Sequence, residues 1–227
     1  MQVVYEDNSI VVVIKPQNQP SQQDESGDLD LLNEVKAYVK EKYNKPGDAF
    51  IGLVHRLDRP TGGLMVFARN SKSAERLSKQ IQSGQFHKTY YAVVDGRIKQ
   101  SSERLVHYLK KDEKNKIVKL CPPLESGAKK AELIYKCLDR NDEHSLLEIQ
   151  ILTGRSHQIR VQLSSIGYPL YGDMKYNKSA KKGNLALWAG RLEFEHPITK
   201  AKMVFVSSPD ETKAPWNEFK ISKYFMR

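Results

Sequence analysis

Short hydrophobic runs separated by polar turns form the main pattern along this chain. Residues 3–16, VVYEDNSIVVVIKP, predict two strands joined by a polar turn, with Pro16 ending the second strand. Residues 17–28 are polar and predict a mobile loop. Apolar residues at helical spacing then predict a helix over residues 31–43, which a Pro-Gly pair ends. One helix is therefore expected to cover a sheet.

The rest of the chain is dominated by strand-like runs. Residues 52–55 and 64–68 predict strands, and the next segment predicts a helix that Ser71 caps and Gly84 ends. Residues 156–167, SHQIRVQLSSIG, predict a third helix, which Gly167 ends. Further strands are predicted at residues 87–94, around Val118, and at residues 131–138, 146–152, 185–189 and 203–206.

These elements predict an α+β fold with a mixed, mainly antiparallel β-sheet core and peripheral helices. At 227 residues, of which 39% are hydrophobic, the chain can bury the core of one large domain or of two closely joined ones. We expect a single catalytic domain over residues 1–227. The sequence has no internal repeat, coiled coil, GxGxxG or P-loop motif, so nothing in it favours a nucleotide cofactor.

The charge balance changes the picture, because 37 Lys and Arg residues against 27 Asp and Glu give a net charge of +10. Such a balance favours a polyanionic partner, above all a nucleic acid, although a basic surface that serves only solubility is the alternative. Lysine runs are either tracks for a phosphate backbone or solvated faces. They lie at Lys110, Lys111, Lys114, Lys116 and Lys119, at Lys129 and Lys130, and at Lys178, Lys181 and Lys182.

Other residue types narrow the class of protein. Cys121 and Cys137 lie outside any zinc-ligand spacing, so we expect no metal. No apolar run approaches the roughly 20 residues that cross a bilayer, and the N-terminus lacks the features of a signal peptide. The sequence predicts a cytoplasmic protein with reduced thiols and no membrane partner.

The segment HRLDRPTGG, residues 55–63, places one carboxylate, Asp58, among His55, Arg56 and Arg59. Neighbouring cations favour the charged form of a carboxylate, and an ionised carboxylate that a substrate can approach is a plausible nucleophile. Taken alone, however, an Asp flanked by Arg is more often part of a structural ion pair.

Two further segments add candidate chemistry. HKTYYAVVDG, residues 87–96, contains Tyr90, and LTGRSHQIRVQLSSIGYPLYGD, residues 152–173, contains His157 and Arg160. Each residue has an ordinary structural interpretation. Tyr90 would be a core aromatic, Arg160 a charge on a helix surface, and His157 a solvated side chain of a first helical turn.

Together and in this order, HRLDxxTGG, KTYYAVVDG and LTGRSHQIRVQL followed by GYPLYGD resemble the three motifs of the RluA family of RNA pseudouridine synthases. The resemblance extends over essentially the whole chain. It implies the pseudouridine synthase fold and an isomerase that converts uridine in RNA to pseudouridine, with no cofactor and no metal. It also implies the stand-alone catalytic core of the family, without an N-terminal RNA-binding domain.

The same resemblance implies roles for individual residues. Asp58 matches the essential catalytic aspartate, Tyr90 the tyrosine that stacks on the target base, and Arg160 the arginine that pairs with that aspartate. Arg56 matches the arginine that fills the space left by the flipped base. The residues expected to contact RNA or substrate are His55, Arg56, Arg59, Thr61, Lys88, Arg155, His157 and Gln158.

The chain departs from the family at Gly62, where many members have Ser, and at Gln162, where many have His. The implied partner is a stem-loop of tRNA or ribosomal RNA. We expect the protein itself to be a monomer. Asp58 acts as a nucleophile or as a base, and the sequence does not distinguish these routes. A glycoside hydrolase is a weaker alternative, because it needs two carboxylates and only Asp173 offers a second one. An RNA-binding module without activity is another.

Overall fold

The computed structural model describes residues 1–44, 46–180 and 183–225. The chain divides into two compact units. Unit 1 consists of Met1–Lys88 and Ala189–Ser207, and unit 2 consists of Thr89–Trp188 and Ser208–Arg227. The chain crosses between the units three times, inside strands β5 (His87–Asp95) and β10 (Leu187–Glu195) and again after Ser207. A single catalytic domain over residues 1–227 stays a prediction.

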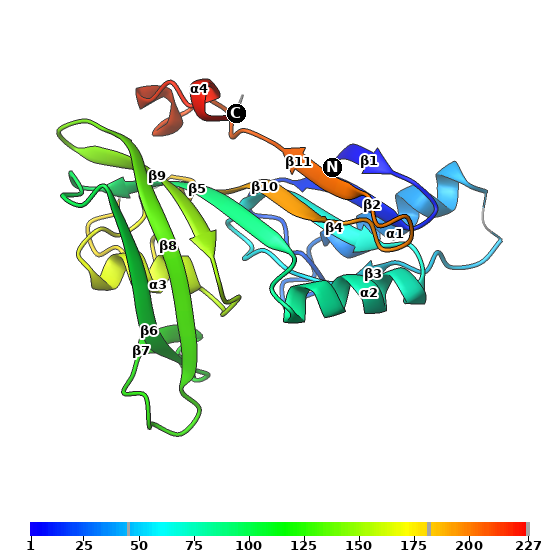
Figure 1. The fold of residues 1–227 in the computed structure, drawn as a ribbon, viewed down its shortest axis with the longest axis horizontal. Coiled ribbons are helices and arrows are strands. Elements are labelled where there is room, and N and C mark those ends of the chain that lie inside the picture. The colour runs from blue at the N-terminus through cyan, green and yellow to red at the C-terminus, as the bar shows by residue number, and fades with distance from the viewer. Residues whose placement is uncertain (45, 181–182, 226–227) are drawn as a thin grey trace. The chain divides into compact units, whose positions relative to one another are not determined.

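Unit 1 is built on a sheet with the strand order β1-β2-β4-β10, to which β11 and β3 are added. Antiparallel ladders join β1 to β2, β2 to β4, β3 to β4 and β10 to β11. Figure 1 shows helix α2 lying along one face of this sheet. The elements not yet bounded are β1 (Gln2–Glu6), β2 (Ile10–Lys15), β3 (Gly52–Leu53), β4 (Gly62–Ala68), β11 (Lys202–Val206), α1 (Leu31–Lys42) and α2 (Ser71–Gln82).

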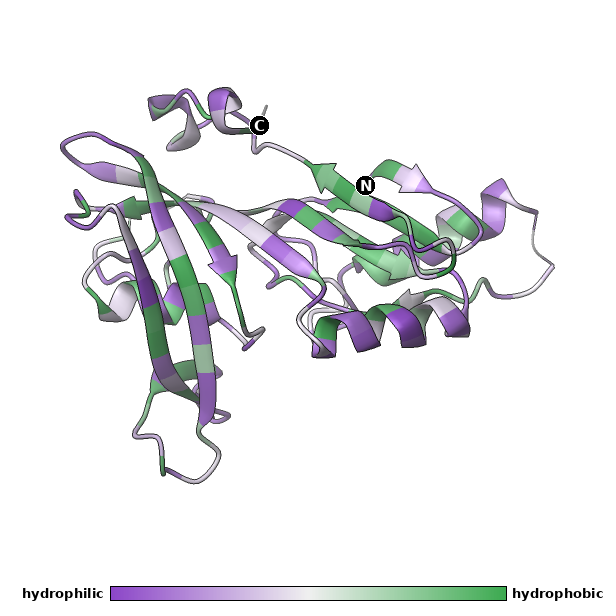
Figure 2. Ribbon diagram, viewed as in Figure 1, coloured by the Kyte–Doolittle hydropathy of each residue, from purple (hydrophilic) through white to green (hydrophobic). Residues whose placement is uncertain are grey.

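Alternation along the strands explains the core of unit 1, because successive side chains point to opposite faces of a sheet. Ile10 and Val12 of β2 and Leu64 and Val66 of β4 pack in one cluster with Leu77 of α2. The intervening residues of these two strands are also buried, so both faces of the sheet are covered. The hydrophobic stretches on these strands stand out in Figure 2.

Unit 2 is an antiparallel sheet with the strand order β5-β9-β8-β6-β7. The short elements near the C-terminus supply Trp216, Phe219 and Ile221, which pack with Tyr91 and Val93 of β5. The further elements are β6 (Ser102–Asp112), β7 (Ile117–Leu120), β8 (Lys129–Arg140), β9 (His144–Ile151), α3 (Gln158–Ser165), η1 (Trp216–Glu218) and α4 (Ser222–Phe225).

The observed fold confirms the predicted α+β class and its mainly antiparallel sheet. Strand β6 was not predicted, because most of its side chains are charged or polar and only Leu105 and Leu109 are buried. The cap of α2 is Asn70 and not Ser71, since the Asn70 side chain accepts a hydrogen bond from the backbone N–H of Ser73 at 2.8 Å. None of the helices in the described part of the chain is long and apolar enough to cross a membrane.

Gly63 is required by the backbone at the start of β4. Its φ of +117° is unfavourable for L side chains, and a Cβ atom there would lie 2.3 Å from the carbonyl oxygen of Ala189 in β10. Gly84, which follows α2, has a comparable positive φ of +74°, but a Cβ there would meet nothing within 4 Å.

We expect Gly63→Ala to lower the free energy of unfolding by at least about 2 kcal/mol more than the control Gly84→Ala, because Gly63 combines strain with a backbone clash and Gly84 has no such clash. Urea unfolding of both variants and the wild type measures the difference. Equal losses in the two variants would show that β4 and β10 separate easily enough to admit a methyl group.

Candidate active site

Asp58 lies in a tight turn of unit 1 between β3 and β4. The backbone N–H of Thr61 donates to the carbonyl of Asp58 at 2.9 Å, which closes the turn. Leu57 and Thr61 are buried, whereas Arg56 is exposed and Asp58 is partly exposed. The turn therefore presents alternate side chains, with a carboxylate that solvent or a ligand can reach.

The loop before α1 holds the backbone on both sides of Asp58. The Ser21 hydroxyl donates to the carbonyl of Leu57 at 2.8 Å and accepts from the Leu57 N–H at 3.2 Å. Gln17 donates from Nε2 to the carbonyl of Pro60 at 3.1 Å. The first part of the loop over residues 17–28 therefore supports the turn through its polar side chains, and the mobility of this loop stays a prediction.

Lys15 holds the same turn through a hydrogen bond from its side chain. It is completely buried at the end of β2, and its Nζ donates to the carbonyls of Pro16, Gln19 and Arg59 at 2.9, 2.6 and 3.0 Å. Burial lowers the pKa of Lys15 to about 7, while the negative charge of Asp58 acts in the opposite direction. Three carbonyl partners match the three N–H donors of an ammonium group. The lysine thus connects the backbone beside Asp58 to the core.

His55 is a core residue and not an exposed base. Its Nε2 lies 3.1 Å from the backbone N–H of Val66 and accepts from it, and its ring centroid lies 5.5 Å from that of Phe86. Burial, reinforced by the charge of Lys88, holds the pKa of His55 well below its usual range. This neutral histidine supports β4, so its expected contact with RNA is not favoured by its position.

The other expected RNA contacts of unit 1 differ in exposure. Arg59 is bound by the loop before α1, with Nη1 2.8 Å from the Ser26 hydroxyl and ion pairs to Asp24 and Asp28. Thr61 is buried. Lys88 is partly buried, and this burial lowers its pKa to about 8. Arg56 is the exposed cation beside Asp58.

Arg160 and Asp173 form a buried, two-point ion pair in unit 2. Arg160 donates from Nε to Oδ2 of Asp173 at 2.8 Å and from Nη2 to Oδ1 at 2.7 Å. Arg160 is 6% exposed and Asp173 is 1% exposed. The guanidinium also lies 5.1 Å from the ring centroid of Tyr176. Arg160 is therefore held rigidly and is not the surface charge of a helix.

Asp173 is the residue whose importance the sequence alone did not reveal. Its Oδ1 also accepts from the backbone N–H groups of Lys175 and Tyr176 at 3.0 and 3.2 Å, so Asp173 holds the following turn as well as the ion pair. Gly172 before it has a φ of +71°, and a Cβ there would lie 2.4 Å from the carbonyl oxygen of Asn184. In the sequence, the available signal was a glycine directly before an acid.

Tyr90 and His157 occupy defined positions in unit 2. Tyr90 lies on β5 opposite Ile149 of β9 and is 6% exposed. His157 has a positive φ of 51° at the start of α3, and its Nδ1 lies 2.6 Å from the hydroxyl of Tyr176. The same hydroxyl accepts from the backbone N–H of Val118 at 2.8 Å, so Tyr176 connects the His157 ring to β7.

Gln158 and Arg155 fix the loop before α3. Gln158 accepts at Oε1 from the Thr153 hydroxyl at 2.7 Å and from the backbone N–H of Arg155 at 3.0 Å. Its Nε2 donates to the carbonyl of Glu132 at 3.0 Å, so its polar groups serve the protein itself. Arg155 is exposed and donates from Nε to the carbonyl of Lys130 at 2.9 Å. Of these two expected RNA contacts, Arg155 is the accessible one.

The two departures from the family pattern are both buried. Gly62 lies in β4, and Gln162 lies in α3 with Nε2 at 3.3 Å from the carbonyls of both Leu105 and Ala131. Gln162 therefore ties α3 to β6 and β8. Asp58 belongs to unit 1 and Tyr90 and Arg160 belong to unit 2, so the expected pairing of Arg160 with Asp58 stays a prediction. Within the described ranges, no group of three or more His, Cys, Asp or Glu residues could hold a metal ion.

Comparison with known proteins gives one consistent result. Residues 9–165 match the sequence model of the RNA pseudouridylate synthase family. The dual-specificity RNA pseudouridine synthase RluA of Vibrio parahaemolyticus is 32% identical over 206 residues, 86% of this chain and 78% of that protein. The ribosomal large subunit pseudouridine synthase C of Vibrio vulnificus is 29% identical, covering 95% of this chain and 66% of that protein. Human RNA pseudouridylate synthase domain containing 4 shares the fold, with a TM-score of 0.78 at 24% identity over 93% of this chain and 89% of that one.

We expect Ser21→Ala to lower the free energy of unfolding by about 1–3 kcal/mol, because the buried N–H of Leu57 would lose its acceptor. Ser73→Ala is the matched control, since Ser73 is a buried serine of the same unit whose hydroxyl has no hydrogen-bond partner among the described residues. Urea unfolding should show little change or a gain for Ser73→Ala. A loss as large as that of Ser21→Ala would contradict the anchoring role of Ser21.

A double-mutant cycle with Asp173→Asn and Arg160→Gln should give a coupling energy of at least about 1 kcal/mol, because each single change leaves a buried charged partner uncompensated. The exposed pair Lys223 and Asp139, at 3.2 Å, is the control and should show no measurable coupling. Chemical unfolding of the four proteins of each cycle provides the values. Additive effects at Arg160 and Asp173 would show that the pair contributes nothing specific.

Proposed function

Because this chain belongs to the RluA family of RNA pseudouridine synthases, whose members isomerise uridine to pseudouridine in RNA, we propose that it modifies a uridine in a stem-loop of tRNA or ribosomal RNA. The observation that carries the proposal is the family match over residues 9–165, which includes the segments bearing Asp58, Tyr90 and Arg160. The net charge of +10 favours a polyanionic substrate.

Asp58 is proposed as the catalytic group. The reaction breaks the bond between N1 of uracil and C1′ of ribose, rotates the base, and forms a bond from C5 to C1′, while the C5 proton is lost and N1 gains one. Atoms therefore balance without a co-reactant. A carboxylate serves this reaction either by attacking as a nucleophile or by removing a proton. Backbone anchors at Ser21 and Lys15 support this role, since they hold the turn that presents Asp58.

Arg160 is proposed to act on the carboxylate of Asp58. A guanidinium has five N–H donors, and Asp173 engages Nε and Nη2, so the group is fixed yet large enough to serve a second acceptor. Its fork matches a carboxylate better than a lysine does.

Tyr90 and Arg56 are proposed to handle the target nucleotide. Extrusion of a base from a stacked helix costs a few kcal/mol, and stacking on an aromatic ring recovers part of that cost. Tyr90 supplies the ring. Arg56 is exposed beside Asp58, so its side chain is able to fill the space that the flipped base leaves in the RNA. A cytoplasmic monomer remains our prediction for the protein in the cell.

The proposal is tested by mapping pseudouridine in total RNA from cells that lack the gene, complemented with wild type, Asp58→Ala or Tyr90→Phe. We expect at least one tRNA or ribosomal RNA site to disappear without the gene, to return with wild type, and to stay absent with Asp58→Ala. Tyr90→Phe keeps the ring but loses the hydroxyl, so we expect it to bind RNA nearly normally and to turn over slowly. Loss of no site would overturn the proposal and favour an RNA-binding module. Full restoration by Asp58→Ala would refute the role of Asp58.

A further inference from the structure

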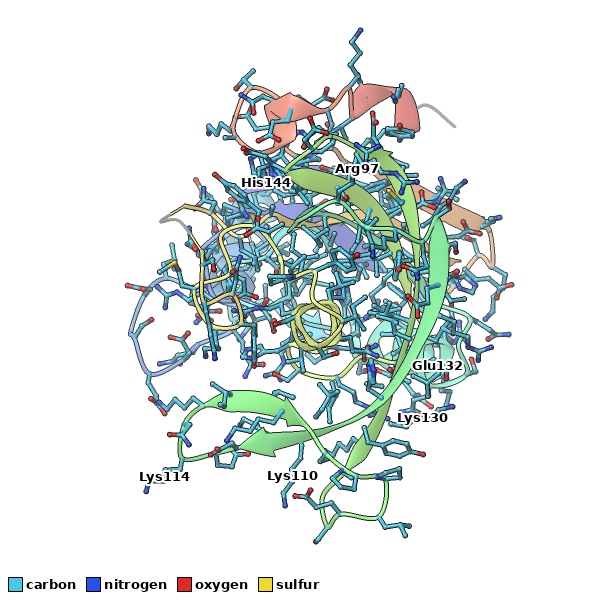
Figure 3. All side chains as sticks on the ribbon, turned by 90° about the vertical axis from the view of Figure 1, so that its left-hand side faces the viewer. Arg97, Lys110, Lys114, Lys130, Glu132 and His144 are labelled. Atoms are coloured by element: carbon cyan, nitrogen blue, oxygen red, sulfur yellow. The ribbon has the colours of Figure 1, made fainter. Side chains whose placement is uncertain are left out.

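One end of the unit-2 sheet concentrates positive charge. Residues 108–130, here named the basic arm, comprise the end of β6, the short strand β7, the start of β8 and the two loops between them. They contain seven lysines and three acidic residues. Figure 3 shows Lys110 and Lys114 projecting from this end of the unit, with Lys130 on the neighbouring strand. The arm therefore has a surplus of cations that its own acids cannot balance.

Strand pairing places two lysines of one run opposite each other and brings Lys130, of a second run, onto the strand next to them. Lys110 of β6 lies directly opposite Lys119 of β7, and Lys130 of β8 lies opposite Tyr108 of β6. Like charges in directly opposite positions are destabilising in a sheet. Ion pairs at 2.8 Å from Lys110 to Glu125 and from Lys119 to Asp112 offset part of this cost. An arrangement that collects repelling cations on one arm favours a polyanionic ligand.

The arm is packed against the helix that carries Arg160. Leu109 and Val118 of the arm form a buried cluster with Ala131, which directly follows the arm in β8, and with Val161, which follows Arg160 in α3. Tyr176, which lies against Arg160, also contacts this cluster. Contacts made by the arm are therefore transmitted to α3 through a packed core and not through a flexible linker.

Two further cations lie against the backbone of the arm. Arg155, just before α3, donates to the carbonyl of Lys130 at 2.9 Å, and Lys175, just after Asp173, donates to the carbonyl of Lys116 at 2.9 Å. Both come from the segments that hold the Arg160–Asp173 pair. The positive surface is thus continuous with the part of unit 2 proposed to act in the reaction.

We propose that the basic arm binds the sugar-phosphate backbone of the substrate RNA away from the target uridine and so sets the position of the stem-loop. This inference rests on the proposed function. Phosphate contacts of this kind position a nucleic acid without reading its sequence. The arm acts on substrate binding and leaves the chemical step to other residues.

The test compares two triple variants with equal loss of charge. The arm variant is Lys110→Gln, Lys114→Gln and Lys119→Gln. The control variant is Lys40→Gln, Lys79→Gln and Lys202→Gln, three unit-1 lysines that are each ion-paired with an acid, at distances of 3.9, 2.6 and 2.7 Å. Affinity for bulk tRNA and for large-subunit ribosomal RNA fragments is measured from about 50 to about 300 mM salt. The values of kcat and KM are measured on an unmodified transcript of the RNA that the enzyme modifies in cells.

For the arm variant we expect the slope of log affinity against log salt to become shallower by about 2, since each lost phosphate contact removes about 0.7–0.9. We also expect KM to rise about tenfold, with kcat within twofold of wild type. The control variant should change the slope by less than about 0.5. Equal slopes in the two variants would overturn the arm's role.

The two proposals fail in different ways. If the wild type forms pseudouridine in no RNA, the proposed function fails, and the salt slopes alone still decide whether the arm binds RNA. If the wild type is active and the arm variant matches the control, only the role of the arm fails. Urea unfolding of both variants identifies any loss that arises from misfolding.

Discussion

The buried ion pair between Arg160 and Asp173 is the interaction on which the organisation of unit 2 depends. Two charged groups this deeply buried are tolerated because each satisfies the other at two points. The pair joins α3 to the segment that follows Gly172, and Tyr176 continues the connection to β7. Removal of either charge would leave the other uncompensated, so the pair constrains the helix, the following turn and the arm together.

In unit 1, the turn that carries Asp58 also depends on polar contacts inside the protein. A charged turn directly precedes β4, a strand buried along its whole length, so the polar backbone of the turn needs partners inside the protein. Ser21 and Gln17 supply them from the loop before α1, and Lys15 supplies another from the end of β2. His55 takes part as a neutral acceptor, because burial disfavours its charged form. The backbone of the turn is therefore held at several points, while Arg56 is exposed and Asp58 is accessible to a ligand.

Secondary structure was predictable where the side-chain pattern reflects burial on one face or on both. The strands β2 and β4 and helices α1 and α2 follow their hydrophobic spacing closely. Strand β6 does not, because its polar side chains face solvent and its place is set by pairing with β8 and β7. Helix α3 was predicted correctly, but a surface position for Arg160 was not, since residues 158–163 are all buried.

The sequence by itself determined the fold class, the family and the three segments that carry Asp58, Tyr90 and Arg160, because these depend on residue type and order along the chain. Only the tertiary structure decided which polar groups meet. The partner of Arg160, the buried state of His55 and Gln158, and the gathering of Lys110 and Lys119 on one arm all depend on strand register and packing between segments far apart in sequence. Such contacts leave no local pattern, because a buried polar residue and an exposed one can occupy the same kind of sequence position.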